Sequence, residues 1–246
     1  MKNLKQHWLL VIFVQLLFIL LLINCEGEGG ASGKSGSMAR FAISGNTLYT
    51  VSDSELSTFD ISTPQKPVLK DQQYINGFAE TIFAKDEILF FGTRQGMLIY
   101  DASNSFKPRY VSRYEHIYSC DPVVVSKNIA FVTLNSGGWN CNRGLDQLDL
   151  IDLSDINNPK LIHSYEMTSP QGLGVDGDIL FVCDDGLKAY HVEDFHAIEP
   201  IGSFDVDAYD VIPDDDYLLL IGQDGLHQYK YSDKGILRVS SIYVNK

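Results

Sequence analysis

The chain has 246 residues, a formal net charge of −13 and four cysteines. This acidity argues against nucleic-acid binding, which requires a basic stripe, so we expect no nucleic-acid partner. It also disfavours electrostatic docking onto anionic lipid, and a neutral polar or cationic partner is easier to accommodate.

The start of the chain has the features of an export signal. A basic beginning precedes an apolar run from Trp8 to Ile23, which is shorter than the ~20 residues that cross a bilayer as a helix. The run meets Cys25 through Leu22-Ile23-Asn24. This resembles a bacterial lipoprotein signal, which implies that residues 1–24 are a signal peptide and that Cys25 is lipidated. An uncleaved anchor and simple secretory cleavage are the alternatives.

The resemblance implies a lipoprotein of the bacterial cell envelope that is anchored in a membrane, and we expect the outer membrane. Residues 25–37 follow as the lipidated cysteine and the stretch EGEGGASGKSGS. Such Gly/Ser-rich sequence behaves as flexible coil and builds no core. We therefore expect the folded part, residues 38–246, to hang from the membrane on this tether.

The rest of the chain repeats one segment five times, with an apolar strand, a short turn and a second strand that often ends in aspartate. The anchor positions Leu48, Leu89, Ala130, Leu180 and Leu219 are spaced by 41, 41, 50 and 39 residues. Repeats of roughly 40 residues with about four short strands are typical of a β-propeller. We predict an all-β, five-bladed β-propeller of four-stranded antiparallel blades, at residues 38–75, 76–118, 119–168, 169–206 and 207–246.

Turn residues fall at matching places in the repeats. Gly96, Gly186 and Gly225 predict tight hairpins between second and third strands, where a positive φ is often required. After the third strand an aspartate opens a turn that a proline closes, at Asp60 with Pro67, Asp101 with Pro108 and Asp152 with Pro159.

The third repeat is longer because residues 135–146 form an insertion. No leftover strand is visible that could clasp the first and last blades together. We therefore expect closure of the ring to rest on face-to-face packing of those two blades, with an open arc or a dimer as the alternative.

The repeats resemble the LVIVD repeat. The resemblance rests on Leu148 to Asp152 with Pro159, Ser119 to Val125, Asn142 to Asp152 and Gly172 to Gly177, and it spans about residues 40–244. His191 and Lys230 depart from it, because they stand where the repeat has aspartate. That family is found in bacterial surface and exported proteins and is propeller-like. The resemblance implies the same fold and no particular reaction.

Three cysteines remain besides Cys25. Cys183 lies inside an apolar strand, which favours a buried free thiol. Cys120 leads into the innermost strand of the third blade, and Cys141 lies in the insertion. Propeller topology brings these two places to one face and export permits oxidation, so we predict a disulfide between Cys120 and Cys141. Two buried thiols are the alternative.

One end of the central channel is predicted to be polar. Each innermost strand starts nine residues before its anchor, and the five starts are Ala39, Glu80, Asp121, Gln171 and Asp210. The side chains expected beside them are Trp139, Arg143, Asp184 and Tyr209. We predict that this rim binds a polar ligand, or a cation such as Ca²⁺ that the carboxylates would recruit. Turn-capping residues around a hydrated channel are the alternative.

The leading hypothesis is a non-catalytic envelope lipoprotein whose propeller is a binding scaffold that uses the face around the channel mouth. Its partner would be another envelope protein or a carbohydrate, and no cofactor is implied. The alternative is a glycan-acting hydrolase that uses carboxylates at the channel mouth. A propeller hosts many unrelated activities, so the fold alone does not choose between these functions.

We predict that lipid attachment depends on Cys25. Metabolic labelling with a fatty-acid analogue should mark the wild-type chain and leave Cys25→Ala unmarked, because acyl transfer requires the thiol. The Cys183→Ala variant is the matched control and should keep the label. Label retained by Cys25→Ala would contradict the assignment.

Overall fold

A computed structural model describes residues 36–115, 122–137, 145–232 and 235–244. All of these lie in one compact unit, residues 31–246. Every regular element in the described residues is a β-strand, numbered β1 to β20. Accordingly, these residues contain no helix that is long and apolar enough to cross a membrane.

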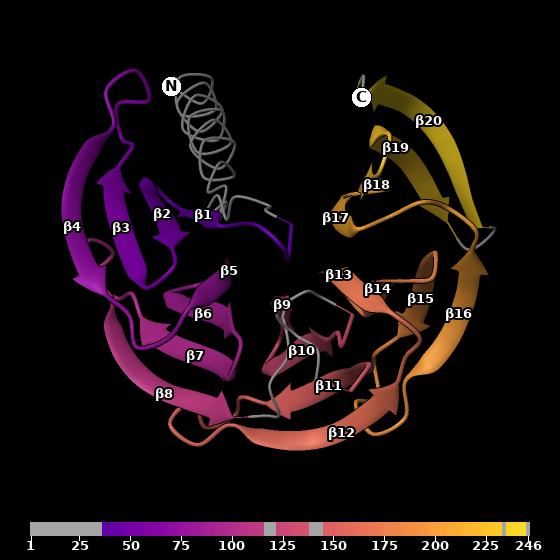
Figure 1. The fold of residues 1–246 in the computed structure, drawn as a ribbon, viewed down its shortest axis with the longest axis horizontal. Coiled ribbons are helices and arrows are strands. Elements are labelled where there is room, and N and C mark those ends of the chain that lie inside the picture. Colours follow the sequence, from indigo (N-terminus) through magenta and orange to yellow (C-terminus); the bar gives the residue numbers. More distant parts are fainter. Residues whose placement is uncertain (1–35, 116–121, 138–144, 233–234, 245–246) are drawn as a thin grey trace, which may run out of the picture. The chain divides into compact units, whose positions relative to one another are not determined.

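The strands form five separate antiparallel sheets of four strands each, arranged as the blades of a propeller (Figure 1). Blade one contains β1 (Phe41–Ser44), β2 (Thr47–Ser52), β3 (Glu55–Asp60) and β4 (Val68–Tyr74). Blade two contains β5 (Ala79–Lys85), β6 (Ile88–Thr93), β7 (Gly96–Asp101) and β8 (Arg109–Glu115). Blade three contains β9 (Val123–Ser126), β10 (Ile129–Leu134), β11 (Gln147–Asp152) and β12 (Lys160–Glu166).

Blade four contains β13 (Pro170–Asp176), β14 (Ile179–Asp184), β15 (Leu187–His191) and β16 (Glu199–Phe204). Blade five contains β17 (Asp210–Asp214), β18 (Tyr217–Gly222), β19 (Gly225–Ser232) and β20 (Gly235–Tyr243). The predicted fold class, a five-bladed β-propeller, is confirmed. Each predicted anchor lies in the second strand of its blade, and the insertion falls between β10 and β11.

The turn residues act as the sequence predicts. Gly96, Gly186 and Gly225 have φ values of 135°, 108° and 150°. After the third strand, the carboxylate of Asp101 accepts the N–H of Ser103 at 2.8 Å. Asp60 and Asp152 make the same contact with the residue two positions on, so each aspartate closes its own turn.

The core consists of four apolar clusters, one between each pair of successive blades. Side chains alternate between the two faces of a strand, so one strand supplies two clusters. In β6, for example, Leu89 and Phe91 pack towards blade one, and Phe90 packs towards blade three. Blades two, three and four are therefore covered on both faces.

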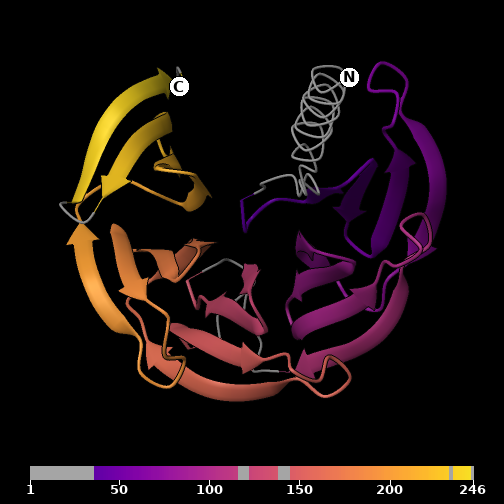
Figure 2. The same cartoon turned by 180° about the vertical axis from the view of Figure 1, so that it is seen from behind.

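Innermost strands pack in chain order, β1 on β5, β5 on β9, β9 on β13 and β13 on β17. The described strands include no comparable pair between blade five and blade one, which stand at the two ends of an arc (Figures 1 and 2). The expected face-to-face packing of the first and last blades is therefore wrong for the described residues. The five blades form an open arc.

The outward faces of the two end blades carry apolar side chains that are only partly covered. One row crosses blade one from β1 to β4 through Ile43, Leu48, Phe59 and Leu69. A second row crosses β18 to β20 through Ile221, Leu226 and Ile242. None of these seven residues belongs to the four clusters.

A short segment before β1 joins the two ends of the arc. Ser37 Oγ donates to Asp210 at 2.9 Å and accepts the N–H of Leu173 at 2.8 Å. The N–H of Met38 donates to the second carboxylate oxygen of Asp210 at 3.3 Å. Ser37 and Asp210 are both buried. The segment therefore links blade one to the inner strands of blades four and five.

The docked chain thus includes Gly36 and Ser37, two residues at the end of the predicted tether. Glycine suits the first position, because a Cβ there would lie 2.0 Å from a carboxylate oxygen of Asp210. Burial raises the pKa of Asp210 to about 6, although the hydrogen bonds from Ser37, Met38 and Val211 lower it in part.

We predict that Gly96→Ala strongly destabilises the fold. An L-residue rarely adopts this φ, at a cost of about 1–3 kcal/mol, and the new Cβ would lie 1.9 Å from the carbonyl oxygen of Tyr114. Gly45→Ala is the matched control. Gly45 also has a positive φ, but no atom lies within 4 Å of its Cβ position, so about 1 kcal/mol is expected. Urea unfolding would measure both losses, and equal losses would contradict the clash.

A second prediction concerns the Ser37–Asp210 link. The pKa of Asp210 is higher in the folded than in the unfolded protein, so its contribution to the unfolding free energy falls as pH rises from about 4 to about 6. The loss is about 3 kcal/mol. Asp210→Asn should remove this part of the pH dependence, measured by urea unfolding between pH 4 and pH 7.5. The exposed Asp185→Asn should retain it, and an unchanged profile in Asp210→Asn would contradict the assignment.

Candidate functional site

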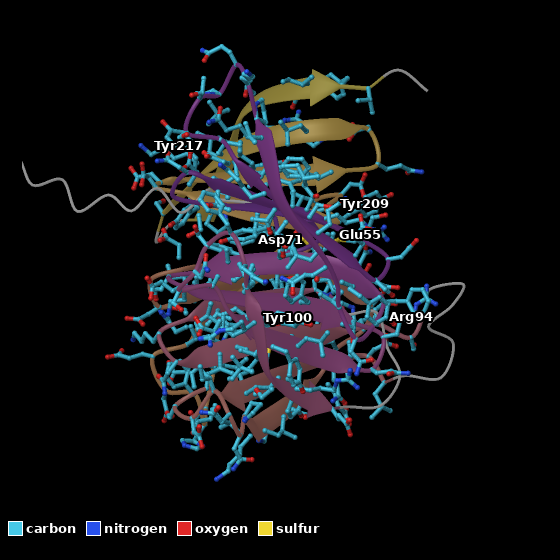
Figure 3. All side chains as sticks on the ribbon, turned by 90° about the vertical axis from the view of Figure 1, so that its left-hand side faces the viewer. Glu55, Asp71, Arg94, Tyr100, Tyr209 and Tyr217 are labelled. Atoms are coloured by element: carbon cyan, nitrogen blue, oxygen red, sulfur yellow. The ribbon has the colours of Figure 1, made fainter. Side chains whose placement is uncertain are left out.

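The candidate site is a cavity of about 590 Å³ at the channel mouth. Four blades build its wall. Its polar side chains come from Arg40, Glu80, Thr81, Asn135, Ser169 and Gln171, and its apolar part from Met38, Pro122 and Pro170. The site lies at the end where innermost strands begin and where the hairpins between second and third strands turn. In Figure 3, Glu55, Arg94 and Tyr209 lie towards this end, and Tyr217 lies towards the other.

An ion pair fixes the one carboxylate among the described wall residues. Arg94 Nε donates to Glu80 Oε1 at 2.8 Å. The guanidinium of Arg94 also lies over the ring of Phe78, with 5.9 Å between Cζ and the ring centroid. Both side chains of the pair are only partly exposed, so Glu80 presents a neutralised, oriented carboxylate to the cavity.

The base of the insertion is held against the next blade. Asn135 Nδ2 donates to the carbonyl oxygen of Pro170 at 2.7 Å, and Asn135 Oδ1 accepts the N–H of Gly137. Asp146 closes the base from the other side, because it accepts both the N–H and the hydroxyl of Ser136 at 2.9 and 2.8 Å. Hydrogen bonds therefore fix this part of the wall.

The structure brings two of the predicted rim residues, Glu80 and Gln171, into this wall. Asp210 is buried beneath Ser37 and Met38, so its carboxylate does not line the cavity. Only Met38 of that segment reaches the cavity. No pattern in the sequence predicts that Ser37 covers Asp210, because the two residues lie 173 positions apart.

Two further predicted residues have structural contacts. Asp184 is fully buried; its carboxylate accepts the N–H groups of Thr168 and Ser169 and pairs with Lys188 Nζ at 2.6 Å. Tyr209 is 37% exposed, and its carbonyl oxygen accepts the N–H of Gly172 from blade four. Asp184 therefore ties together the residues that precede β13, and the backbone of Tyr209 joins blades four and five.

Several predicted residues lie outside the described residues: Cys25, Cys120, Asp121, Trp139, Cys141 and Arg143. The predicted lipidation and the predicted disulfide therefore stay predictions. Cys183 is a buried free thiol, as the sequence predicts, and burial raises its pKa. Among the residues that the structure describes, no three His, Cys, Asp or Glu side chains are grouped so that they could hold a metal ion.

The same fold occurs in solved structures of low sequence identity. A functionally unknown protein from Desulfotomaculum acetoxidans superposes with a TM-score of 0.69 at 10% identity, over 86% of this chain and 71% of that one. The periplasmic gluconolactonase PpgL from Pseudomonas aeruginosa gives 0.60 at 12%, over 81% and 68%. BamB from Moraxella catarrhalis gives 0.52 at 15%, over 82% and 60%. At these identities the likeness concerns the fold alone.

The comparison with curated protein sequences gives no match. The LVIVD repeat matches residues 35–73, which cover blade one and the segment that joins the ends of the arc. The residues that carry the resemblance in the sequence analysis lie mainly in blades three and four, so the match adds an independent copy of the repeat. The chain is therefore a five-bladed β-propeller whose first blade matches the LVIVD repeat.

Proposed function

We propose that this protein is a non-catalytic binding scaffold of the bacterial envelope, and that the cavity at the channel mouth receives a polar segment of another envelope protein. The observation that carries the proposal is the composition of the wall. It offers a cation at Arg40, a carboxylate at Glu80 and an amide at Gln171 within one cavity of about 590 Å³. A wall with both charges and neutral donors suits the mixed polar groups of a peptide loop.

The anchoring of the scaffold is part of the same proposal. The sequence supports a lipid on Cys25, followed by a flexible tether, and a disulfide between Cys120 and Cys141 that would pin the insertion beside the cavity. Both features suit export, and a periplasmic protein is among the solved structures with this fold. The propeller would then present its channel mouth at the membrane surface on a tether of about a dozen residues.

A glycan-acting hydrolase is the second candidate, and a protein described as a gluconolactonase shares this fold. The wall is less suited to this chemistry. Among its described residues only Glu80 is a carboxylate, and Arg94 neutralises it. Glycoside hydrolysis needs two carboxylates that flank the scissile bond. Asp210 would be a second acid with a raised pKa, but Ser37 and Met38 separate it from the cavity.

We predict that a photo-crosslinking amino acid at position 171 captures a specific envelope protein in living cells. The same amino acid at position 193 is the matched control, because Glu193 is exposed in a turn at the opposite end of the blades and should give no such adduct. Adding Arg40→Glu to the position-171 protein should abolish the adduct, because it reverses a wall charge.

Equal crosslinking at both positions, or an adduct that Arg40→Glu leaves unchanged, would overturn the binding proposal. Turnover of a lactone or glycan by the purified full chain, abolished by Glu80→Gln, would favour the hydrolase instead. The two candidates are therefore separated by independent measurements.

A further inference from the structure

A second cavity, of about 580 Å³, lies on the lateral side of the propeller where blade one meets blade two. Its wall includes three tyrosines, Tyr74 at the end of β4, Tyr100 on β7 and Tyr110 on β8. In Figure 3, which views the molecule from this side, Tyr100 lies midway between the two ends of the blades. The cavity shares no residue with the wall of the channel mouth.

The exposed rings of Tyr74 and Tyr110 form a platform in this wall, and the buried Tyr100 supports Tyr110. Tyr74 is 75% exposed and Tyr110 is 54% exposed. The ring of Tyr110 meets that of Tyr100 edge to face, with centroids 5.7 Å apart, and Tyr100 meets Phe91 in the same way at 5.1 Å. Tyr100 and Phe91 are buried, so the core fixes the ring that supports Tyr110. Large aromatic faces held open to solvent mark binding surfaces.

Planar polar groups surround this platform. One Nη of Arg113 donates to the carbonyl oxygen of Asn76 at 2.6 Å, and the other lies 3.8 Å from Glu115 Oε1. The Nε of Arg113 is enclosed and has no acceptor among the described residues. A guanidinium carries five N–H groups, so these contacts leave donors for a ligand. The carboxylate of Glu115 is 78% exposed and supplies acceptors beside them.

From this arrangement we infer that the lateral cavity binds an uncharged oligosaccharide. The apolar C–H face of a sugar ring stacks on tyrosine, and its hydroxyls both donate to Glu115 and accept from Arg113. Glu115 balances the charge of Arg113, and the chain carries −13 overall, so an acidic glycan is disfavoured. A proline-rich peptide would use the aromatic rings, but it brings no hydroxyl pairs to the Arg113–Glu115 pair. The volume lies within the range of small-ligand sites.

Calorimetric titration of the full chain, in a detergent without a sugar headgroup, tests the inference. The probes are neutral oligosaccharides (cellotetraose, chitotetraose and maltotetraose), trigalacturonic acid and a proline-rich decapeptide. At least one neutral oligosaccharide should bind, and the other two classes should not. Tyr110→Ala should weaken that binding at least tenfold. Tyr243→Ala is the matched control, because it removes a tyrosine that is 60% exposed on the outer strand of blade five, and it should bind as the wild type does.

The Glu115→Gln variant keeps the test valid if Tyr110→Ala unfolds. The Glu115 side chain is exposed and contributes little to packing, so the variant should fold. Loss of the carboxylate should still weaken sugar binding severalfold. Gln171→Ala should leave sugar binding unchanged, which separates this cavity from the channel mouth. Three results would overturn the inference: no neutral oligosaccharide binds, binding persists in both Tyr110→Ala and Glu115→Gln, or only the acidic sugar or the peptide binds.

Discussion

The packing of one blade face on the next is the interaction on which the rest of the structure depends. Strands such as β6 and β10 are apolar on both sides, so their sheets need a partner on each face. Burying one large apolar side chain contributes about 1.5–3 kcal/mol, and each cluster holds several such side chains. A single hydrogen bond contributes about 1 kcal/mol. Packing of the blade faces therefore fixes the order of the blades. The two polar cavities lie outside these packed faces, at the channel mouth and on the lateral side.

The contact between Ser37 and Asp210 has a different character from this packing. It joins the ends of an arc whose terminal blades each keep one apolar face partly covered. A buried carboxylate is costly, and here three hydrogen bonds, from Ser37, Met38 and the N–H of Val211, offset the cost. The same contact sets the composition of the channel mouth, because it removes one acid from the surface and places Met38 in the wall.

The sequence is a good guide where a feature repeats or acts locally. The strands follow from the anchors, the hairpins from glycines such as Gly96, and the turns from aspartates that bond their own backbone. Glu80 and Gln171 share a wall because equivalent repeat positions lie at one end of the channel. The docking of Ser37 could not be predicted, because Ser37 belongs to a Gly/Ser-rich stretch whose composition is typical of flexible coil. The lateral cavity is hidden for another reason: Tyr74 and Tyr110 belong to different blades, and scattered tyrosines are most simply interpreted as packing residues.

The route by which the chain enters the propeller has a mechanical consequence. Residues 36–38 lie against the inner strands of blades four and five before the chain continues into β1. A force that pulls on the backbone before residue 36 would act first on the contacts of Ser37. Those contacts are with Leu173 in blade four and Asp210 in blade five. Only after they rupture would the pull reach β1 and its pairing with β2. The contacts with the inner strands of blades four and five would thereby protect the first blade from a pulling force.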